Sequence, residues 1–147
     1  LKPEFQTYIK NVLVNAKILA ETLKNNGFKI YSGGTDTHLM LVDLRPFNVK
    51  GNLASESLCR ANITCNKNGI PFDTEKPMIT SGIRLGSQAA TTRGFGLKEF
   101  EKVGELITKV IKGLSENPND NSKIEEEVRN EVINLCSSFP IYKKLNR

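Results

Sequence analysis

One short stretch carries the residue types best suited to binding a small anion. In the sequence SGIRLG (81–86), Arg84 lies between two glycines. If this stretch is a strand, Ile83 and Leu85 share one face and Arg84 projects from the other, because side chains alternate along a strand. A guanidinium with little bulk around it can donate paired hydrogen bonds to a carboxylate or a phosphate. The pattern alone is explained at least as well by a structural arginine paired with a neighbouring aspartate.

The other polar stretches are weaker candidates. The loop NKNGIP (66–71) could hydrogen-bond a heteroaromatic ligand, although most such loops are only connections. His38 precedes an apolar run with no nucleophile evidently beside it, so a satisfied histidine is favoured over a general base. Arg93 is expected to tie down a loop, and Gly33-Gly34 lacks the spacing of a phosphate loop. These residues indicate an anion-binding domain without a complete catalytic constellation.

Composition excludes several classes of protein. The three cysteines form no C-x-x-C pair and there is one histidine, so we expect reduced thiols, a cytoplasmic protein and no metal site. No apolar run approaches the roughly 18 residues of a membrane span, and the start of the sequence does not resemble a signal peptide. The net charge of +5 invites a nucleic-acid function, but the 21 basic residues are scattered. We therefore expect no membrane and no nucleic-acid partner.

Hydrophobic periodicity predicts the elements that must position these residues. Helices are expected over residues 5–23, 53–61, 97–114 and from 122 onward. Strands are expected over residues 28–31, 37–44, 62–66 and 78–85, the second of them covered on both faces. Gly27 should stop the first helix, and a capping box of Ser122 and Glu125 should open the last one. The pattern predicts an α+β, two-layer domain with a small, mainly antiparallel sheet packed by helices.

Five stretches, in this order, resemble the C-terminal part of serine hydroxymethyltransferase, a family of fold-type I enzymes that depend on pyridoxal phosphate. They are SGGTDTH (32–38), RANIT (60–64), NKN (66–68), TSGIRLG (80–86) and TRGF (92–95). The opening PEFQTY (3–8) and the closing FPIY (139–142) are also similar to that family. The resemblance therefore covers essentially the whole chain and implies the small C-terminal domain of that fold.

The resemblance implies a substrate and a role for several residues. The full enzyme would interconvert serine and tetrahydrofolate with glycine and 5,10-methylenetetrahydrofolate. Arg84 matches the arginine that binds the amino acid carboxylate in this family, and Asn68 matches the asparagine that hydrogen-bonds folate. Lys76-Pro77-Met78 falls where the family lines the folate pocket, although Lys76 and Met78 replace its usual serine and phenylalanine.

The resemblance also implies what these residues lack. The lysine that holds pyridoxal phosphate belongs to the family's large domain, so we expect residues 1–147 to be one C-terminal domain with no catalytic residue and no activity alone. Residues 1–27 would form a long helix linking it to the large domain. Arg93 and His38 match family positions to which we assign only a supporting role. The full enzyme is expected to be a homodimer or a tetramer.

Two other classes of function remain open on the residues alone. A stand-alone basic α+β module would bind nucleic acid or another anion, with Arg84 on phosphate and a strong dependence on salt. A purely structural interaction domain would show no effect of any substitution on a small ligand. Exposed apolar residues on the helix over 5–23 are expected for a domain of the enzyme as well.

Overall fold

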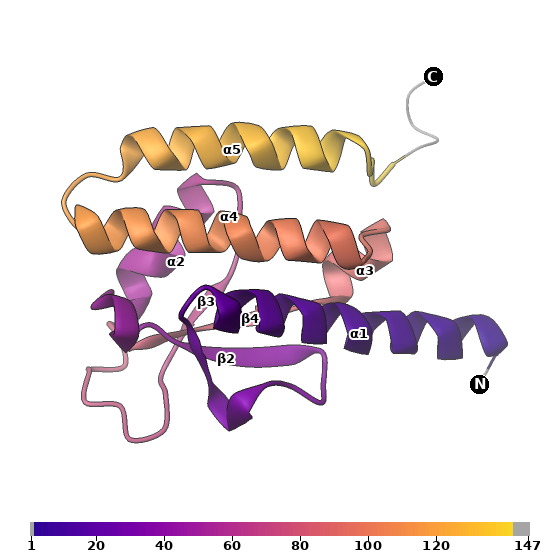
Figure 1. Cartoon of the computed structure of the whole chain (residues 1–147), viewed down its shortest axis with the longest axis horizontal. Helices are drawn as coiled ribbons and strands as arrows, with labels where there is room; N and C mark the ends of the chain where they lie inside the picture. The colour runs from indigo at the N-terminus through magenta and orange to yellow at the C-terminus, as the bar shows by residue number, and fades with distance from the viewer. Residues whose placement is uncertain (1, 143–147) are drawn as a thin grey trace.

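The computed structural model describes residues 2–142, which contain both helices and strands and end in three successive helices (Figure 1). The helices are α1 (Pro3–Asn25), α2 (Gly51–Arg60), α3 (Gln88–Arg93), α4 (Leu97–Glu116) and α5 (Ser122–Ser137). The strands are β1 (Lys29–Ile30), β2 (Leu39–Asp43), β3 (Asn66–Asn68) and β4 (Gly82–Gly86). Two short 3-10 helices, η1 (Tyr31–Gly33) and η2 (Arg45–Phe47), follow β1 and β2.

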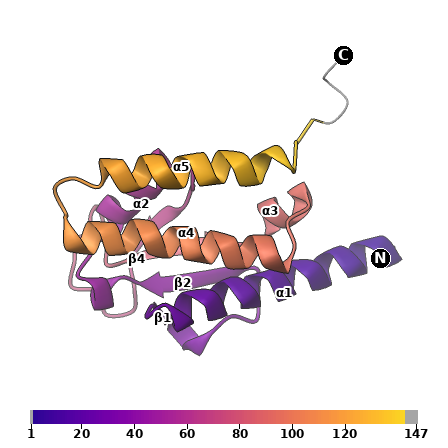
Figure 2. The ribbon, with the colours of Figure 1, turned by 45° about the horizontal axis from the view of Figure 1, so that its top comes forward.

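The four strands form one sheet in the order β1-β2-β4-β3, and every neighbouring pair is antiparallel. In both ribbon views α4 lies between α5 and the sheet (Figures 1 and 2). This arrangement confirms the predicted α+β domain with a small antiparallel sheet. The strand β4 is central, because it pairs with β2 on one side and β3 on the other.

Alternation along the two central strands separates a core face from an open face. Met40 and Val42 of β2 and Ile83 and Leu85 of β4 are at most 6% exposed and belong to the hydrophobic core. The core continues into apolar side chains of α1 and α4, which include Leu19, Leu23, Leu106, Ile107, Val110 and Ile111. On the other face Leu39 and Leu41 are half-buried, so the strand predicted to be covered on both faces is covered less completely on this one.

The first helix follows its prediction closely. Pro3 stands at its first position, where the missing N–H is harmless, and the helix runs to Asn25. Gly27 then adopts φ +96°, a left-handed conformation that costs a glycine little, and its N–H is accepted by the carbonyl of Lys24. Phe5, Ile9 and Val14 are 45%, 38% and 49% exposed, so the expected apolar exposure lies in the first half of the helix.

The predicted capping box at the start of α5 is wrong. The cap residue is Asn121, and its amide donates instead to Ser57 Oγ and to the carbonyl of Val110. Glu125 does not turn back toward the first turn of its helix, because its carboxylate accepts hydrogen bonds from Ser57 and Arg60 of α2. A charged partner from another element is the stronger competitor for this carboxylate.

Two strands have other bounds than predicted, and one short helix was not predicted. The strand expected over residues 62–66 is β3 (Asn66–Asn68), because Asn62 takes a positive φ of 63° in the turn that leaves α2. The strand expected from residue 78 begins only at Gly82, after a turn that contains Thr80 at φ 61°. The short helix α3 (Gln88–Arg93) was not predicted.

Candidate functional site

Arg84 lies in the middle of β4, on the face of the sheet that points away from the core. Its cross-strand neighbours are Leu41 of β2 and Asn66 of β3, and its neighbours on the same face of its own strand are Gly82 and Gly86. The side chain is exposed. The backbone of Arg84 is thus held from both sides, and its side chain faces outward as the alternation of the sequence predicted. The two glycines do not leave open space, because Ile70 packs against Gly82 and Gln88 against Gly86.

The hydrogen bonds of the other arginines set Arg84 apart. Within residues 2–142, Arg45 donates to Asp43, Arg60 to Glu125, Arg93 to the carbonyl of Phe139, and Arg129 to the carbonyl of Arg60. No hydrogen bond or ion pair joins the Arg84 side chain to any residue in that described part of the chain. The alternative of a structural arginine paired with an aspartate therefore fails for the described residues.

Arg84 is one of the residues that line a cavity of about 1090 Å³. The cavity is bounded by β4, by α3 and by the end of α5, and apolar side chains such as Ile63, Val132 and Leu135 contribute to its wall. Two arginines, Arg84 and Arg93, line it, and no aspartate or glutamate does so among residues 2–142. A cavity with unbalanced positive charge and apolar walls suits a small organic anion.

Arg93 fixes the end of α5 to α3. Its Nε donates to the carbonyl of Phe139 at 2.6 Å and its Nη2 to the carbonyl of Cys136 at 3.2 Å. Because the guanidinium already has these acceptors, Arg93 shapes the wall of the cavity. A supporting role for the site stays a prediction.

Asn68 stands at the end of β3, opposite Gly82 of β4. It is half-buried, and its side-chain amide donates to the carbonyl of Gly69 at 2.8 Å. By alternation it shares the open face with Asn66 and Arg84. The structure therefore brings Asn68 and Arg84 to one face of the sheet, although Asn68 does not line the cavity of Arg84.

The residues Lys76, Pro77 and Met78 are exposed in the loop that joins β3 to β4. The carbonyl of Lys76 accepts hydrogen bonds from the N–H groups of Ile79 and Thr80, which closes a tight turn around them. Met78 is 74% exposed. This loop and the cavity of Arg84 are separate features in the described residues.

His38 precedes β2 and is exposed. Its carbonyl accepts the N–H of Ser87 at 3.0 Å, so the backbone at His38 helps to hold the turn after β4. Its side chain lines neither the cavity of Arg84 nor the cavity of about 800 Å³ between α1 and residues 31–37. The described geometry gives His38 no place beside Arg84.

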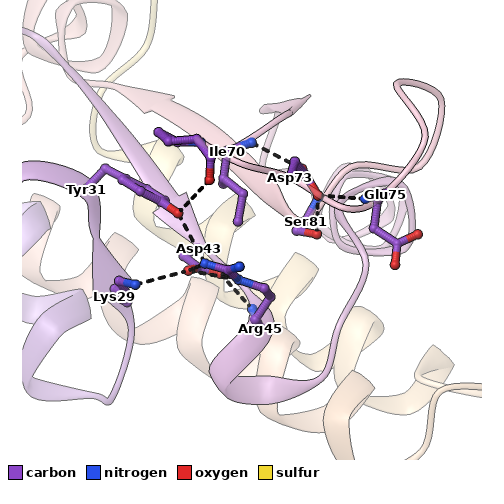
Figure 3. A network of polar contacts seen from close by, with 9 residues as sticks. Lys29, Tyr31, Asp43, Arg45, Ile70, Asp73, Glu75 and Ser81 are labelled. Atoms are coloured by element: carbon purple, nitrogen blue, oxygen red, sulfur yellow. Dashed lines mark hydrogen bonds and ion pairs between the residues drawn. The ribbon is translucent and has the colours of Figure 1, made fainter.

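A polar network that the sequence did not reveal holds the other end of the sheet (Figure 3). Asp43, only 1% exposed, accepts hydrogen bonds from Arg45, and Lys29 lies 3.8 Å from the same carboxylate. Burial acts to raise the pKa of Asp43, but the hydrogen bonds from Arg45 outweigh it, so the pKa lies below its usual value. Arg45 also donates to Tyr31 Oη at 3.1 Å, and Tyr31 donates to the carbonyl of Pro71 at 3.5 Å.

Three observations limit other chemistry within residues 2–142. No group of three or more His, Cys, Asp or Glu side chains is placed to hold a metal ion. None of the helices in that part is long and apolar enough to cross a membrane. Cys59, Cys65 and Cys136 are free thiols, and burial raises the pKa of Cys65 to about 11.

Comparison with known proteins gives a consistent set of relatives. The family model for serine hydroxymethyltransferase matches residues 1–107. A serine hydroxymethyltransferase of Pelagibacter ubique is 86% identical over 145 residues, which are 99% of this chain and 33% of the relative. Serine hydroxymethyltransferases of Marinomonas sp. and Paramagnetospirillum magneticum are 63% and 62% identical, each over 97% of this chain and 34% of the relative.

The chain thus spans about a third of the length of the curated relatives that it matches. The family model covers well over half of the chain, including all four strands and the arginine of the open face. The alignment with the Pelagibacter ubique relative covers 99% of the chain. The chain belongs to the serine hydroxymethyltransferase family.

Proposed function

We propose that these residues act as the C-terminal domain of a pyridoxal-phosphate-dependent serine hydroxymethyltransferase. The reaction would interconvert serine and tetrahydrofolate with glycine and 5,10-methylenetetrahydrofolate. The observation that carries the proposal is the unpaired guanidinium of Arg84 in a chain of this family. Family membership favours this transferase over a stand-alone basic module for nucleic acid or another anion.

Arg84 would bind the carboxylate of the amino acid. Its exposed guanidinium has no partner among the described residues, and the paired strands on either side fix the direction of its side chain. Two parallel hydrogen bonds from one guanidinium set both the position and the orientation of the amino acid. Because no aspartate or glutamate belongs to the described cavity wall, no negative side chain there would repel a bound anion.

Asn68 and the loop around Lys76, Pro77 and Met78 would contribute to the folate site. The amide of Asn68 can both donate and accept hydrogen bonds, which suits the heteroaromatic ring of a folate. Exposed Met78 offers an adaptable apolar surface, and Lys76 offers a positive charge for the carboxylates of the folate tail.

Residues 2–142 do not fit the covalent attachment of pyridoxal phosphate. Every lysine in this part is exposed or half-buried, so none has the enclosed surroundings of an attachment lysine. We assign attachment to a large domain elsewhere in the enzyme, to which residues 1–27 would lead. Family membership supports the further proposals that the enzyme is a cytoplasmic homodimer or tetramer, with Arg93 and His38 as supporting residues.

A chimeric enzyme tests the proposal directly. Residues 1–147 would replace the matching segment of the Pelagibacter ubique relative, and formation of glycine from serine would be measured with and without tetrahydrofolate. We expect the chimera to be active, and Arg84→Ala to lower kcat/KM for serine roughly 100-fold. This corresponds to two charge-assisted hydrogen bonds of about 1.5 kcal/mol each.

A matched control is Arg129→Ala. Arg129 is also exposed and donates to a backbone carbonyl, but it lies on α5 outside the cavity. It should change kcat/KM less than about twofold. A chimera without tetrahydrofolate-dependent activity would refute the proposed function, and near-normal serine kinetics in Arg84→Ala would refute the role of Arg84.

A further inference from the structure

The loop between β3 and β4, residues 69–81, is organised around the carboxylate of Asp73 (Figure 3). Oδ2 of Asp73 accepts the N–H of Ile70 at 3.1 Å and the N–H of Ser81 at 2.9 Å. Oδ1 accepts the N–H of Glu75 at 3.0 Å and the hydroxyl of Ser81 at 2.7 Å. One side chain therefore holds the beginning, the middle and the end of the loop.

These bonds support a backbone that is strained at one position. Phe72, next to Asp73, has φ 57°, a left-handed conformation that is unfavourable for a residue with a bulky side chain. Its ring is 98% exposed, so contacts of the ring do not hold it there. The backbone N–H of Asp73 donates to the carbonyl of Ile70 at 3.0 Å and closes a turn with Phe72 at its third position, and the carboxylate of Asp73 adds hydrogen bonds on both sides of this bend.

Residues 79–81 are also held from outside the loop, because the N–H groups of Leu44, Gly51 and Asn52 donate to the carbonyls of Ser81, Thr80 and Ile79. Before residue 79, the polar contacts with the rest of the described protein are weaker than the bonds to Asp73. Tyr31 donates to the carbonyl of Pro71 at 3.5 Å, and Lys50 forms an ion pair with Glu75 in which the lysine is 46% exposed. Exposed ion pairs of this kind contribute little because water screens them. Burial acts to raise the pKa of Asp73, but the hydrogen bonds to its carboxylate outweigh this effect and hold the pKa below its usual value. The carboxylate therefore stays ionised, and each of its two oxygens can accept two hydrogen bonds.

We infer that Asp73 is a positioning residue for folate binding, which it serves by fixing the backbone of the loop that carries Lys76, Pro77 and Met78. This inference rests on the proposed function. Asp73 has no hydrogen bond or ion pair with these three side chains in the described structure, so it acts through the backbone. Arg84, by contrast, is held by the pairing of β4 with β2 and β3. Loss of the Asp73 carboxylate should therefore weaken folate binding and spare amino acid binding.

The test is Asp73→Asn in the chimeric enzyme described above. An amide keeps one acceptor oxygen but cannot accept the N–H groups that now meet at the other oxygen. We expect the Kd for tetrahydrofolate, measured by calorimetry with glycine present, to rise about tenfold, while the KM for serine changes less than about twofold. Chymotrypsin should also cleave faster after Phe72, a readout that does not depend on turnover.

The matched control is Asp120→Asn. Asp120 is another turn carboxylate that accepts a backbone N–H, from Ser122, but it lies between α4 and α5. It should leave the Kd for tetrahydrofolate unchanged. If Asp73→Asn does not fold, Ser81→Ala removes a single donor to Asp73 and should raise that Kd about two- to threefold.

Two outcomes separate this inference from the proposed function. If the unmodified chimera binds and uses tetrahydrofolate but neither Asp73→Asn nor Ser81→Ala alters that Kd, or folate and serine weaken equally, the inference fails and the proposed function stands. A chimera that shows no tetrahydrofolate-dependent activity overturns the proposed function and this inference with it.

Discussion

The hydrogen bonds of buried Glu125 with Ser57 and Arg60 should be a major source of stability for this domain. Glu125, 5% exposed, accepts hydrogen bonds from Ser57 Oγ at 2.6 Å and from Arg60 Nε and Nη2 at 2.7 Å each. It thereby ties α5 to α2. The substitution Glu125→Ala removes all three bonds and leaves the fully buried hydroxyl of Ser57 without its acceptor.

The magnitude follows from the exposure of the two donors. The hydrogen bond from buried Ser57 to a carboxylate is worth about 2 kcal/mol, because the orphaned hydroxyl cannot reach water. The side chain of Arg60 is 54% exposed, so water can replace its partner and its share falls to about 1 kcal/mol. We therefore expect Glu125→Ala to lower the free energy of unfolding by about 3 kcal/mol, which is a fall of about 2 M in the urea midpoint.

The assay is urea unfolding of the chain, followed by far-ultraviolet circular dichroism. The matched control is Glu126→Ala, one residue further along α5, where the glutamate is exposed and forms no hydrogen bond or ion pair within residues 2–142. The control should change the free energy of unfolding by less than about 0.5 kcal/mol. Equal effects of the two substitutions would refute the assignment of stability to the hydrogen bonds of Glu125.

The same pair predicts a dependence on pH. Hydrogen bonds from Arg60 hold the pKa of Glu125 below its usual value. A depressed pKa in the folded state means that the pair stabilises the fold above about pH 4.3, the value for an unfolded glutamate. This contribution is lost as the pH falls through the folded pKa. The difference in stability between the unaltered chain and Glu125→Gln should therefore be largest near pH 7 and shrink below about pH 4, and a constant difference would contradict the argument.

Two further predictions concern close packing and thiol reactivity. Gly82→Ala should lower the free energy of unfolding by about 2 kcal/mol in the same urea assay, because a Cβ there would lie 2.6 Å from Ile70 Cγ2 and 2.8 Å from the carbonyl oxygen of Val42. An unchanged midpoint would show that the strands can separate at no cost. Iodoacetamide at pH 8 should modify exposed Cys59 well before Cys65, whose pKa burial raises to about 11. Equal rates by mass spectrometry would contradict the burial of Cys65.

The sequence predicted features that depend on local periodicity. The long first helix follows from regularly spaced apolar residues and a terminal glycine, and the outward direction of Arg84 follows from strand alternation. The family resemblance was based on short sequence motifs, which do not depend on where the helices and strands begin and end. These are the features for which neighbours along the chain carry the information.

Features that depend on distant partners could not be predicted in this way. Glu125 looked like part of a capping box because its partner Arg60 is far away in the sequence. The free guanidinium of Arg84 is a property of what surrounds it in space, which periodicity does not describe. Asp73 lies two residues after Pro71 in a turn, and such aspartates commonly accept nearby N–H groups. That signal was present, but it does not show that Ser81 also reaches the same carboxylate.

The alternation of β4 has a genetic consequence. Insertion of a single codon between Gly82 and Arg84 would turn every following side chain of the strand to the opposite face. Arg84 would then point into the hydrophobic interior, and Leu85 would face outward. A two-codon insertion would restore the facing but displace the arginine along the strand. The turn between α4 and α5 imposes no such parity. Length variation among relatives should therefore accumulate in that turn and be purged from β4.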